Sequence, residues 1–139
     1  AGADLNASGS EAKEKPLHYA AYHGHVKVAQ VLLAAGADLN ARGDHGNTPL
    51  HVATRNEQAE VMQVLLAAGA DVNSCNAWGS TPMHSAAYSG YVKVTQILLA
   101  AGADLNASGS EAKEKPLHYA AYHGHVKVAQ VLLAAGADL

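Results

Sequence analysis

The chain has 139 residues, of which 49% are hydrophobic and 15% charged, so it is long enough for one domain and its composition is not that of a disordered chain. The formal net charge is −3, with acidic and basic residues interspersed, which argues against the basic face that nucleic-acid binding requires. Apolar runs are interrupted by Gly and Asp well before the roughly 18 residues of a membrane helix, so neither a nucleic acid nor a membrane is an expected partner.

One pattern recurs along the chain and predicts, each time, a helix, a tight turn, a second helix and a long loop. The first helix begins at a proline, which suits the first helical position because its missing N–H is not needed there. All four prolines fall at this position, with spacings of 33, 33 and 34 residues: Pro16, Pro49, Pro82 and Pro116. We place one domain over residues 1–139, with an end stub at 1–6 and repeats at about 7–40, 41–73, 74–106 and 107–139.

The residue before each proline differs between the repeats. Thr48 and Thr81 can accept a hydrogen bond from the free amides of the first turn, whereas Lys15 and Lys115 cannot. Since the loss of such a cap costs about 1 kcal/mol, the first helix of the two end repeats is predicted to begin less securely.

Glycines are expected to reverse the chain between the paired helices, at Gly24, Gly90 and Gly124, and to end the second helices, at Gly36, Gly69, Gly102 and Gly136. The second repeat carries Glu57 at the reversal, where a left-handed non-glycine residue costs roughly 1 kcal/mol.

The predicted helices have about eight to ten residues, too few to be stable alone, so neighbouring repeats must stabilise one another. We expect stacking to bury Leu17, Ala20, Ala21 and Leu32 against equivalents such as Leu50, Ala53 and Leu65.

The chain also repeats itself over a longer distance: residues 1–39 are identical to residues 101–139. The chain is therefore a three-repeat unit of about 100 residues followed by the start of its next copy. A recent tandem duplication and deliberate construction both explain identity that extends to exposed positions, and the sequence leaves both open.

Three motifs together resemble the ankyrin repeat over nearly the whole chain: Thr-Pro-Leu-His-x-Ala, the Gly-His between the helices, and the closing Leu-Leu-x-x-Gly-Ala-Asp-x-Asn. The resemblance implies an all-α solenoid of antiparallel helix pairs, with hairpin-like loops projecting at about a right angle. It also implies a non-enzymatic role in protein–protein recognition, through the loop tips and the concave face of the first helices. The chain departs from the motif at Lys15, Lys115 and Glu57-Gln58, and the loops at 7–15 and 107–115 are one residue longer than the others.

The family geometry assigns candidate partner-binding residues to two places. The loop tips carry Asp44, His45 and Asn47 in the second repeat and Ala77, Trp78 and Ser80 in the third. The exposed face of the first helices carries Tyr22, His23, Arg55, Asn56, Tyr88, Ser89, Tyr122 and His123. Since Trp, Tyr and Arg most often dominate interface energies, we hypothesise an aromatic, mildly polar groove centred on Trp78 and Tyr88. In the alternative, Trp78 folds back on its own loop and each Tyr covers an aliphatic neighbour.

Histidine, aspartate and asparagine recur at fixed positions of the repeats, where structural roles explain them. The motif histidines His18, His51, His84 and His118 are expected to hydrogen-bond loop backbone between layers. Asp38, Asp71 and Asp104 each follow a cap glycine and are expected to make local hydrogen bonds. The resemblance implies that Asn6, Asn40, Asn73 and Asn106 stand at the family position that asparaginyl hydroxylases can modify. The favoured alternative is that these side chains simply tie down loop backbone.

Metal and enzyme chemistry find little support in the sequence. The pairs His23–His25 and His123–His125 offer at most a weak surface metal site, because a stable zinc site needs three or four ligands and Cys75 is the only cysteine. Neither a nucleophile elbow, a phosphate-cradling glycine loop nor a carboxylate pair with a base is present, so we predict no enzymatic activity and no cofactor. The single cysteine favours an intracellular location, cytoplasmic or nuclear.

A second function is a structural one, in which the chain is a spacer or a self-stacking fibre. Solenoids normally end in repeats with a polar outer face, but the two end repeats here carry no added polar residue at Leu17, Val31 or Leu132. Both ends are therefore expected to expose apolar surface. Head-to-tail contact between such ends need not close and could grow into a filament.

Overall fold

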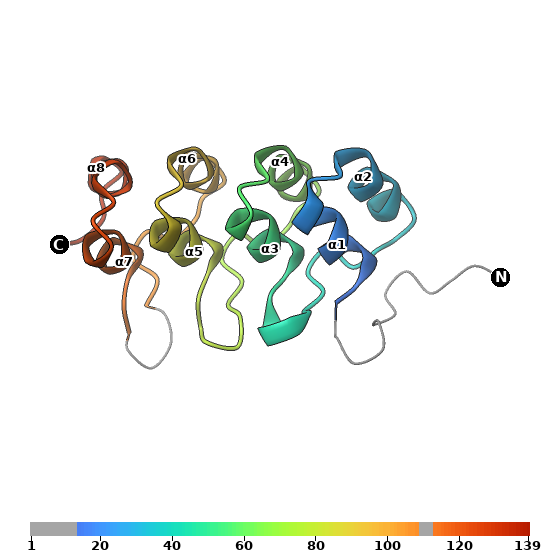
Figure 1. Cartoon of the computed structure of the whole chain (residues 1–139), viewed down its shortest axis with the longest axis horizontal. Helices are drawn as coiled ribbons and strands as arrows, with labels where there is room; N and C mark the ends of the chain where they lie inside the picture. Colours follow the sequence, from blue (N-terminus) through green and yellow to red (C-terminus); the bar gives the residue numbers. More distant parts are fainter. Residues whose placement is uncertain (1–13, 109–112) are drawn as a thin grey trace.

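The computed structural model describes residues 14–108 and 113–139, and over these ranges its regular structure is entirely helical. The helices form two layers that run side by side along the molecule (Figure 1). The first layer contains α1 (Pro16–His23), α3 (Pro49–Arg55), α5 (Pro82–Ser89) and α7 (Pro116–Tyr122). The second contains α2 (Val26–Ala34), α4 (Ala59–Ala67), α6 (Val92–Ala100) and α8 (Val126–Ala134). The prediction of an all-α solenoid is confirmed.

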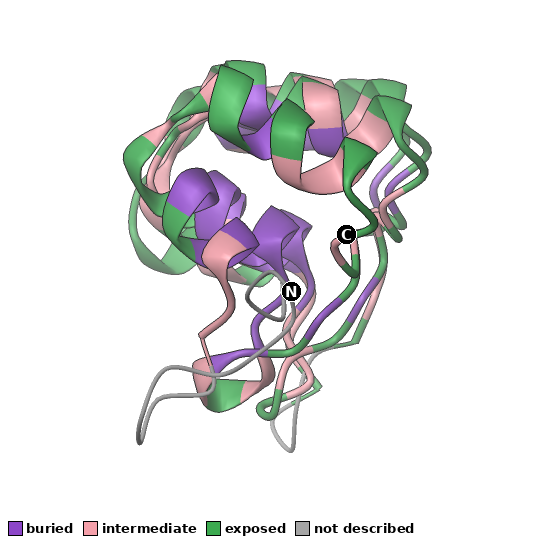
Figure 2. Cartoon of the chain, turned by 90° about the vertical axis from the view of Figure 1, so that its right-hand side faces the viewer, coloured by how far each residue is buried: buried purple, intermediate pink, exposed green. Residues whose placement is uncertain are grey.

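The loops between successive helix pairs extend away from the first layer (Figures 1 and 2). The loop before α3 contains a short 3-10 turn, η1 (Asp44–Gly46). Each helix of a layer packs on the next helix of the same layer, and each first helix packs on its own partner in the second layer. The predicted stub at 1–6, Asn6, and the greater part of the lengthened loops lie outside the described residues.

The first helices begin at the predicted prolines, and their capping follows the residue before each proline. The Thr48 hydroxyl accepts from the His51 backbone N–H at 3.3 Å, and Thr81 does the same from His84 at 3.4 Å. The Lys15 and Lys115 side chains form no cap hydrogen bond. The predicted difference between the inner and the end repeats is confirmed.

Replacing Lys115 by Thr is therefore expected to stabilise the protein by about 1 kcal/mol, because the hydroxyl adds a hydrogen bond to the first turn of α7. The replaced side chain contributes little, since its ion pair with Asp138, at 3.8 Å, lies on the surface. Urea denaturation of the Lys115→Thr variant measures the gain, and Thr48→Ala, which removes an existing cap, should show a loss of similar size. Equal midpoints for Lys115→Thr and the unmodified chain would contradict this account.

The turns between paired helices adopt the predicted left-handed backbone. Gly24 and Gly90 have φ values of 72° and 75°, and Glu57 takes the same conformation at φ 57°. The prediction of eight to ten residues per helix is wrong for α3 and α7, which have seven. Each of these helices ends one residue earlier than α1. The N–H groups of Asn56 and His123 still donate four residues back, to Val52 and Tyr119, but the φ/ψ values of −104°/10° and −93°/2° lie outside the α-helical region.

The core lies between the two layers and between successive repeats, and its side chains are small aliphatics. Leu17 and Leu50 are 1% exposed, and Leu65 is completely buried. Leu32 was expected in this core but is only partly buried, because no described repeat precedes α2. The expectation that Leu17 and Leu132 lie at uncovered ends is also wrong, since both face inward onto a neighbouring repeat.

The second layer forms the outer surface of the molecule, where exposed residues dominate, and buried residues gather on the inner sides of the first layer (Figure 2).

No helix in the part of the chain that the structure describes has both the length and the apolar character that crossing a membrane requires.

Candidate functional site

A row of buried histidines fixes the loops to the first layer. The Nε2–H groups of His18, His51 and His84 donate to backbone carbonyls of the following repeat. The acceptors are Asn47 at 2.9 Å, Ser80 at 2.8 Å and Glu114 at 2.8 Å, in that order. The predicted bond between layers is confirmed for these three histidines, whereas His118, in the last repeat, is exposed.

Burial favours the neutral form of two of these histidines, His51 and His84. Burial lowers the pKa of His51 to about 4, although the hydrogen bond to Ser80 opposes this effect. Burial lowers the pKa of His84 as well, against hydrogen bonds to backbone carbonyls. A neutral imidazole with both nitrogens engaged holds loop backbone in place and has no atom left for acid–base chemistry.

A second row of hydrogen bonds joins the loops at the ends of the second helices. The Asn40 side-chain oxygen accepts from the backbone N–H of Asp71 in the next repeat at 3.0 Å, and the Asp38 carboxylate accepts from the Asn40 N–H at 3.0 Å. The same bonds recur through Asn73 and Asn106. The predicted local role of the aspartates is confirmed, and the asparagines do tie down backbone. Their hydroxylation stays a prediction.

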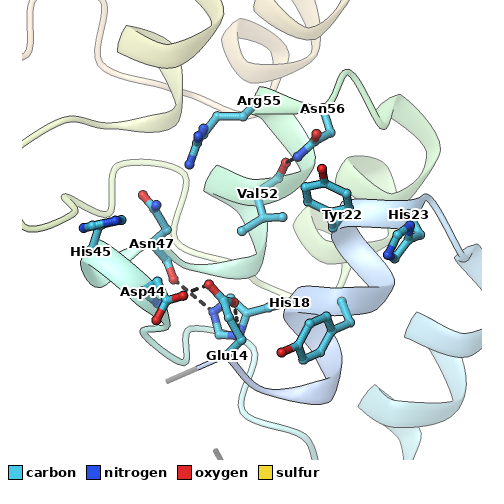
Figure 3. A pocket seen from close by; sticks show the side chains of 11 residues that line it. Glu14, His18, Tyr22, His23, Asp44, His45, Asn47, Val52, Arg55 and Asn56 are labelled. Atoms are coloured by element: carbon cyan, nitrogen blue, oxygen red, sulfur yellow. Dashed lines mark hydrogen bonds and ion pairs between the residues drawn. The ribbon is translucent and has the colours of Figure 1, made fainter. Parts of the chain in front are cut away.

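A groove runs where the loops meet the first-layer helices, and its first part is a hollow of about 470 Å³ between α1 and α3 (Figure 3). Glu14, in the loop before α1, shapes the floor: its Oε1 accepts from the Asp44 N–H at 3.1 Å, and its Oε2 lies 3.5 Å from Nδ1 of His18. The hollow is lined by Glu14, His18, Tyr19, Tyr22, His23, Asp44, His45, Asn47, Val52, Arg55 and Asn56.

A second hollow of about 600 Å³ continues the groove between α3 and α5. His45, Asn47 and Arg55 line both hollows, so the two form one continuous depression. The rest of the second hollow is lined by Asn76, Trp78, Ser80, His84, Ser85, Tyr88, Ser89 and Tyr119. Within the described residues, the Arg55 guanidinium forms neither an ion pair nor a hydrogen bond, and no carboxylate lines this second hollow.

Trp78 lies against the neighbouring loop rather than its own. Its ring is 4.7 Å from the His45 ring between centroids, tilted by 30°, and 54% of the residue is exposed. The Asn76 side-chain oxygen accepts from the backbone N–H groups of Trp78 and Ser80, at 3.0 Å each, which fixes the loop tip that carries the indole. The indole is thus presented on a rigid loop.

Tyr88 is 57% exposed, and it contacts other aromatic rings rather than an aliphatic neighbour alone. Its ring meets Tyr119 edge-on at 6.2 Å and His123 edge-on at 4.3 Å. Such pairs position aromatic rings while leaving one face open to a ligand.

The groove brings together most of the residues predicted for partner binding: Tyr22, His23, Asp44, His45, Arg55, Asn56, Trp78, Tyr88 and Ser89. Tyr122 and His123 do not line either hollow. Tyr122, which is 86% exposed, lies at the C-terminal end of the first layer. Asn47 was expected at an exposed loop tip but is 3% exposed, because its side-chain oxygen accepts from Asn76 at 3.0 Å inside the loop row.

Several lining residues were missed by sequence reasoning. Tyr19, Ser85 and Tyr119 occupy one repeat position, three residues before the predicted face residues Tyr22 and Tyr88, so helical spacing could have found them. Glu14 could not have been found this way, since it comes from a lengthened loop that departs from the motif.

Potential metal ligands do not converge in the described part of the chain, where no three His, Cys, Asp or Glu side chains group as a metal site would require. The rings of His23 and His25 stack on each other with centroids 5.7 Å apart.

Comparison with known protein families agrees with this geometry. Residues 1–76 and residues 66–139 each match the family described as ankyrin repeats (3 copies). No curated protein is significantly similar to the chain in sequence. Because the two matches together span the chain, and the helix pairs and loops have the arrangement that the motifs predict, the chain belongs to the ankyrin repeat family.

Proposed function

We propose that the chain is a non-enzymatic interaction module that binds an extended segment of a partner protein in the groove between the loops and the first-layer helices. Ankyrin repeats are generally protein-interaction modules, which supports the class of function. The observation that carries the proposal is the continuous depression around Arg55, edged by half-exposed Trp78 and Tyr88. Exposed aromatic and arginine side chains gathered in a concavity are typical anchors of an interface.

The chemistry of the second hollow favours a partner segment with an acidic side chain. Arg55 offers the only full charge in its lining, and the hydroxyls of Ser85, Ser89 and Tyr119 add hydrogen-bond donors nearby. A carboxylate can pair with a guanidinium through two parallel hydrogen bonds. Next to that acid, an aromatic or aliphatic side chain would pack on the open face of Trp78.

Selection from a displayed library of random peptides tests the proposal. The enriched peptides are expected to carry Asp or Glu beside a large apolar residue. Arg55→Ala is expected to weaken their binding about 30-fold or more, the effect of losing an interface anchor. Trp78→Ala should weaken it comparably.

Lys93→Ala provides the matched control, because it removes the same charge from an exposed position on α6, in the outer layer. This variant should bind the selected peptides with unchanged affinity. If Arg55→Ala and Trp78→Ala fold normally and still bind as the unmodified protein does, the groove is not the binding site.

A further inference from the structure

The identical segments at 1–39 and 101–139 place the same repeat at both ends of the stack, so each of its surfaces is seen once covered and once uncovered. We name the side of a repeat that meets the preceding repeat its N-facing surface, and the opposite side its C-facing surface. The first repeat shows its N-facing surface uncovered, and the last repeat shows its C-facing surface uncovered. Comparing the exposed fractions of identical residues in the first and last repeats shows which residues pack on a neighbouring repeat.

The N-facing surface of the last repeat is formed by Tyr119, Val128, Val131 and Leu132. It packs on the third repeat, where Val128 is 1% exposed and Leu132 is fully buried. In the first repeat the identical valines, Val28 and Val31, are 49% and 67% exposed. Identical residues of the described chain are therefore covered between the third and fourth repeats and exposed in the first repeat.

The C-facing surface shows the reverse. In the last repeat it is formed by Leu117, His118, Ala121 and Ala129. Ala121 and His118 are exposed, whereas their counterparts in the first repeat, Ala21 and His18, are 0% and 1% exposed beneath the second repeat. The same C-facing residues are thus covered between the first and second repeats and more exposed in the last repeat.

The two open surfaces match a pair that is already joined within the chain. The N-facing surface of the last repeat rests on a C-facing surface formed by Met83, His84, Ala87 and Thr95. At these positions the open C-terminal end differs only by Leu for Met and Ala for Thr, changes of similar or smaller volume that such a contact tolerates. No Asp, Glu, Lys or Arg occurs in either set.

A hydrogen bond of the internal joint has its counterpart at the ends as well. Inside the chain, His84 Nε2–H donates to the Glu114 carbonyl of the last repeat at 2.8 Å. At the open ends the corresponding donor is His118, and the corresponding carbonyl belongs to Glu14, the sequence twin of Glu114. The donor lies on the C-facing surface of one molecule, and the acceptor precedes α1 of the next.

We propose that a second copy of this chain stacks on the C-terminal end of the first, its Tyr19, Val28, Val31 and Leu32 covering Leu117, His118, Ala121 and Ala129. The contact is heterologous and leaves one open end on each side, so growth continues beyond the dimer. The stacking surface and the groove share Tyr19, which lines the first hollow, whereas Arg55, Trp78 and Tyr88 belong to the groove alone.

Sedimentation velocity over a range of protein concentrations tests the stacking, with a reductant present because Cys75 is an exposed thiol. The unmodified chain is expected to form species that increase in size with concentration. Val31→Glu blocks only the N-facing end, and Ala121→Glu blocks only the C-facing end. Ala121→Glu is expected to weaken self-association by more than about a hundred-fold, because Ala87, its counterpart in the internal joint, is fully buried. Val31→Glu is expected to have a smaller effect, because its counterpart Val131 stays partly exposed in that joint.

The mixture of the two variants gives the sharpest result. Val31→Glu keeps an intact C-facing end and Ala121→Glu keeps an intact N-facing end, so an equimolar mixture should form a dimer of one molecule of each and nothing larger. Both positions are exposed in the single chain, so both variants should retain the unfolding midpoint of the unmodified protein. The proposal is overturned if the unmodified chain stays monomeric throughout, or if it assembles while the mixture remains monomeric.

Discussion

Lowering the pH from about 7.5 to about 5 is expected to destabilise the protein by about 2 kcal/mol through His51 alone. Burial lowers the pKa of this histidine to about 4 in the folded chain, from about 6.5 when unfolded. Between these values the unfolded chain binds a proton that the folded chain does not, so stability is complete above the unfolded pKa and is lost as the pH falls toward the folded one. Urea denaturation at a series of pH values measures the slope.

The geometry gives the reason for the low pKa. The Nδ1 atom of His51 accepts from the Thr48 backbone N–H at 3.2 Å, so a proton added there would meet a donor. The Nε2–H group already donates to Ser80 across the repeat boundary. Protonation would therefore cost both the burial of a charge and the hydrogen bond from the Thr48 N–H at the start of α3.

A matched pair of variants separates the contribution of His51 to the pH dependence of stability from that of an exposed histidine. His51→Gln keeps a donor for the Ser80 carbonyl but does not titrate, so its stability should be lower at pH 7.5 and should depend less on pH. His45→Gln, at an exposed ring, should leave the slope unchanged. Part of the slope will persist in His51→Gln, because burial lowers the pKa of His84 as well. A full slope in His51→Gln would contradict the assignment.

The fold could be predicted almost completely from the sequence, because each helix boundary has a local chemical cause. Proline begins the first helices and glycine, or Glu57 in its place, reverses the chain, and these signals need no knowledge of the neighbours. Which side of a helix each leucine faces was harder to predict. Leu17 and Leu32 were expected to be equally buried, but Leu17 faces the following repeat and Leu32 the preceding side, a polarity that exists only once repeats are stacked.

Most of the candidate site was predictable, including the polar residues Asp44, His45 and Arg55, but Asn47 was misplaced and Glu14 was missed. Exposed positions recur at fixed repeat offsets, which located Trp78 and Tyr88. Asn47 was misplaced because its burial depends on a side-chain contact to Asn76 in another repeat. Glu14 was missed because its contact with Asp44 joins residues 30 apart, through a loop that the motif does not describe.

Leu17→Ala is expected to destabilise the protein by about 2–5 kcal/mol, the cost of a cavity at a fully buried leucine. Leu117→Ala makes the identical change in an identical local sequence, since residues 1–39 repeat at 101–139. Its cost in the monomer should be clearly smaller, because Leu117 is only partly buried where no repeat follows it. Urea denaturation of both variants at low protein concentration gives the comparison.

The pair isolates packing from every local contribution. The local sequence, and with it helix propensity and chain entropy, is the same at both sites, so a difference in cost between the two variants reports chiefly on the neighbouring repeat. The opposite order is expected on the N-facing surface, where Val128→Ala should cost more than Val28→Ala because the residues are 1% and 49% exposed. Equal costs within each pair would mean that the repeats do not stabilise one another through these surfaces. A Leu117→Ala cost that rises with protein concentration would place this leucine under a second molecule, because stacking covers it as the second repeat covers Leu17.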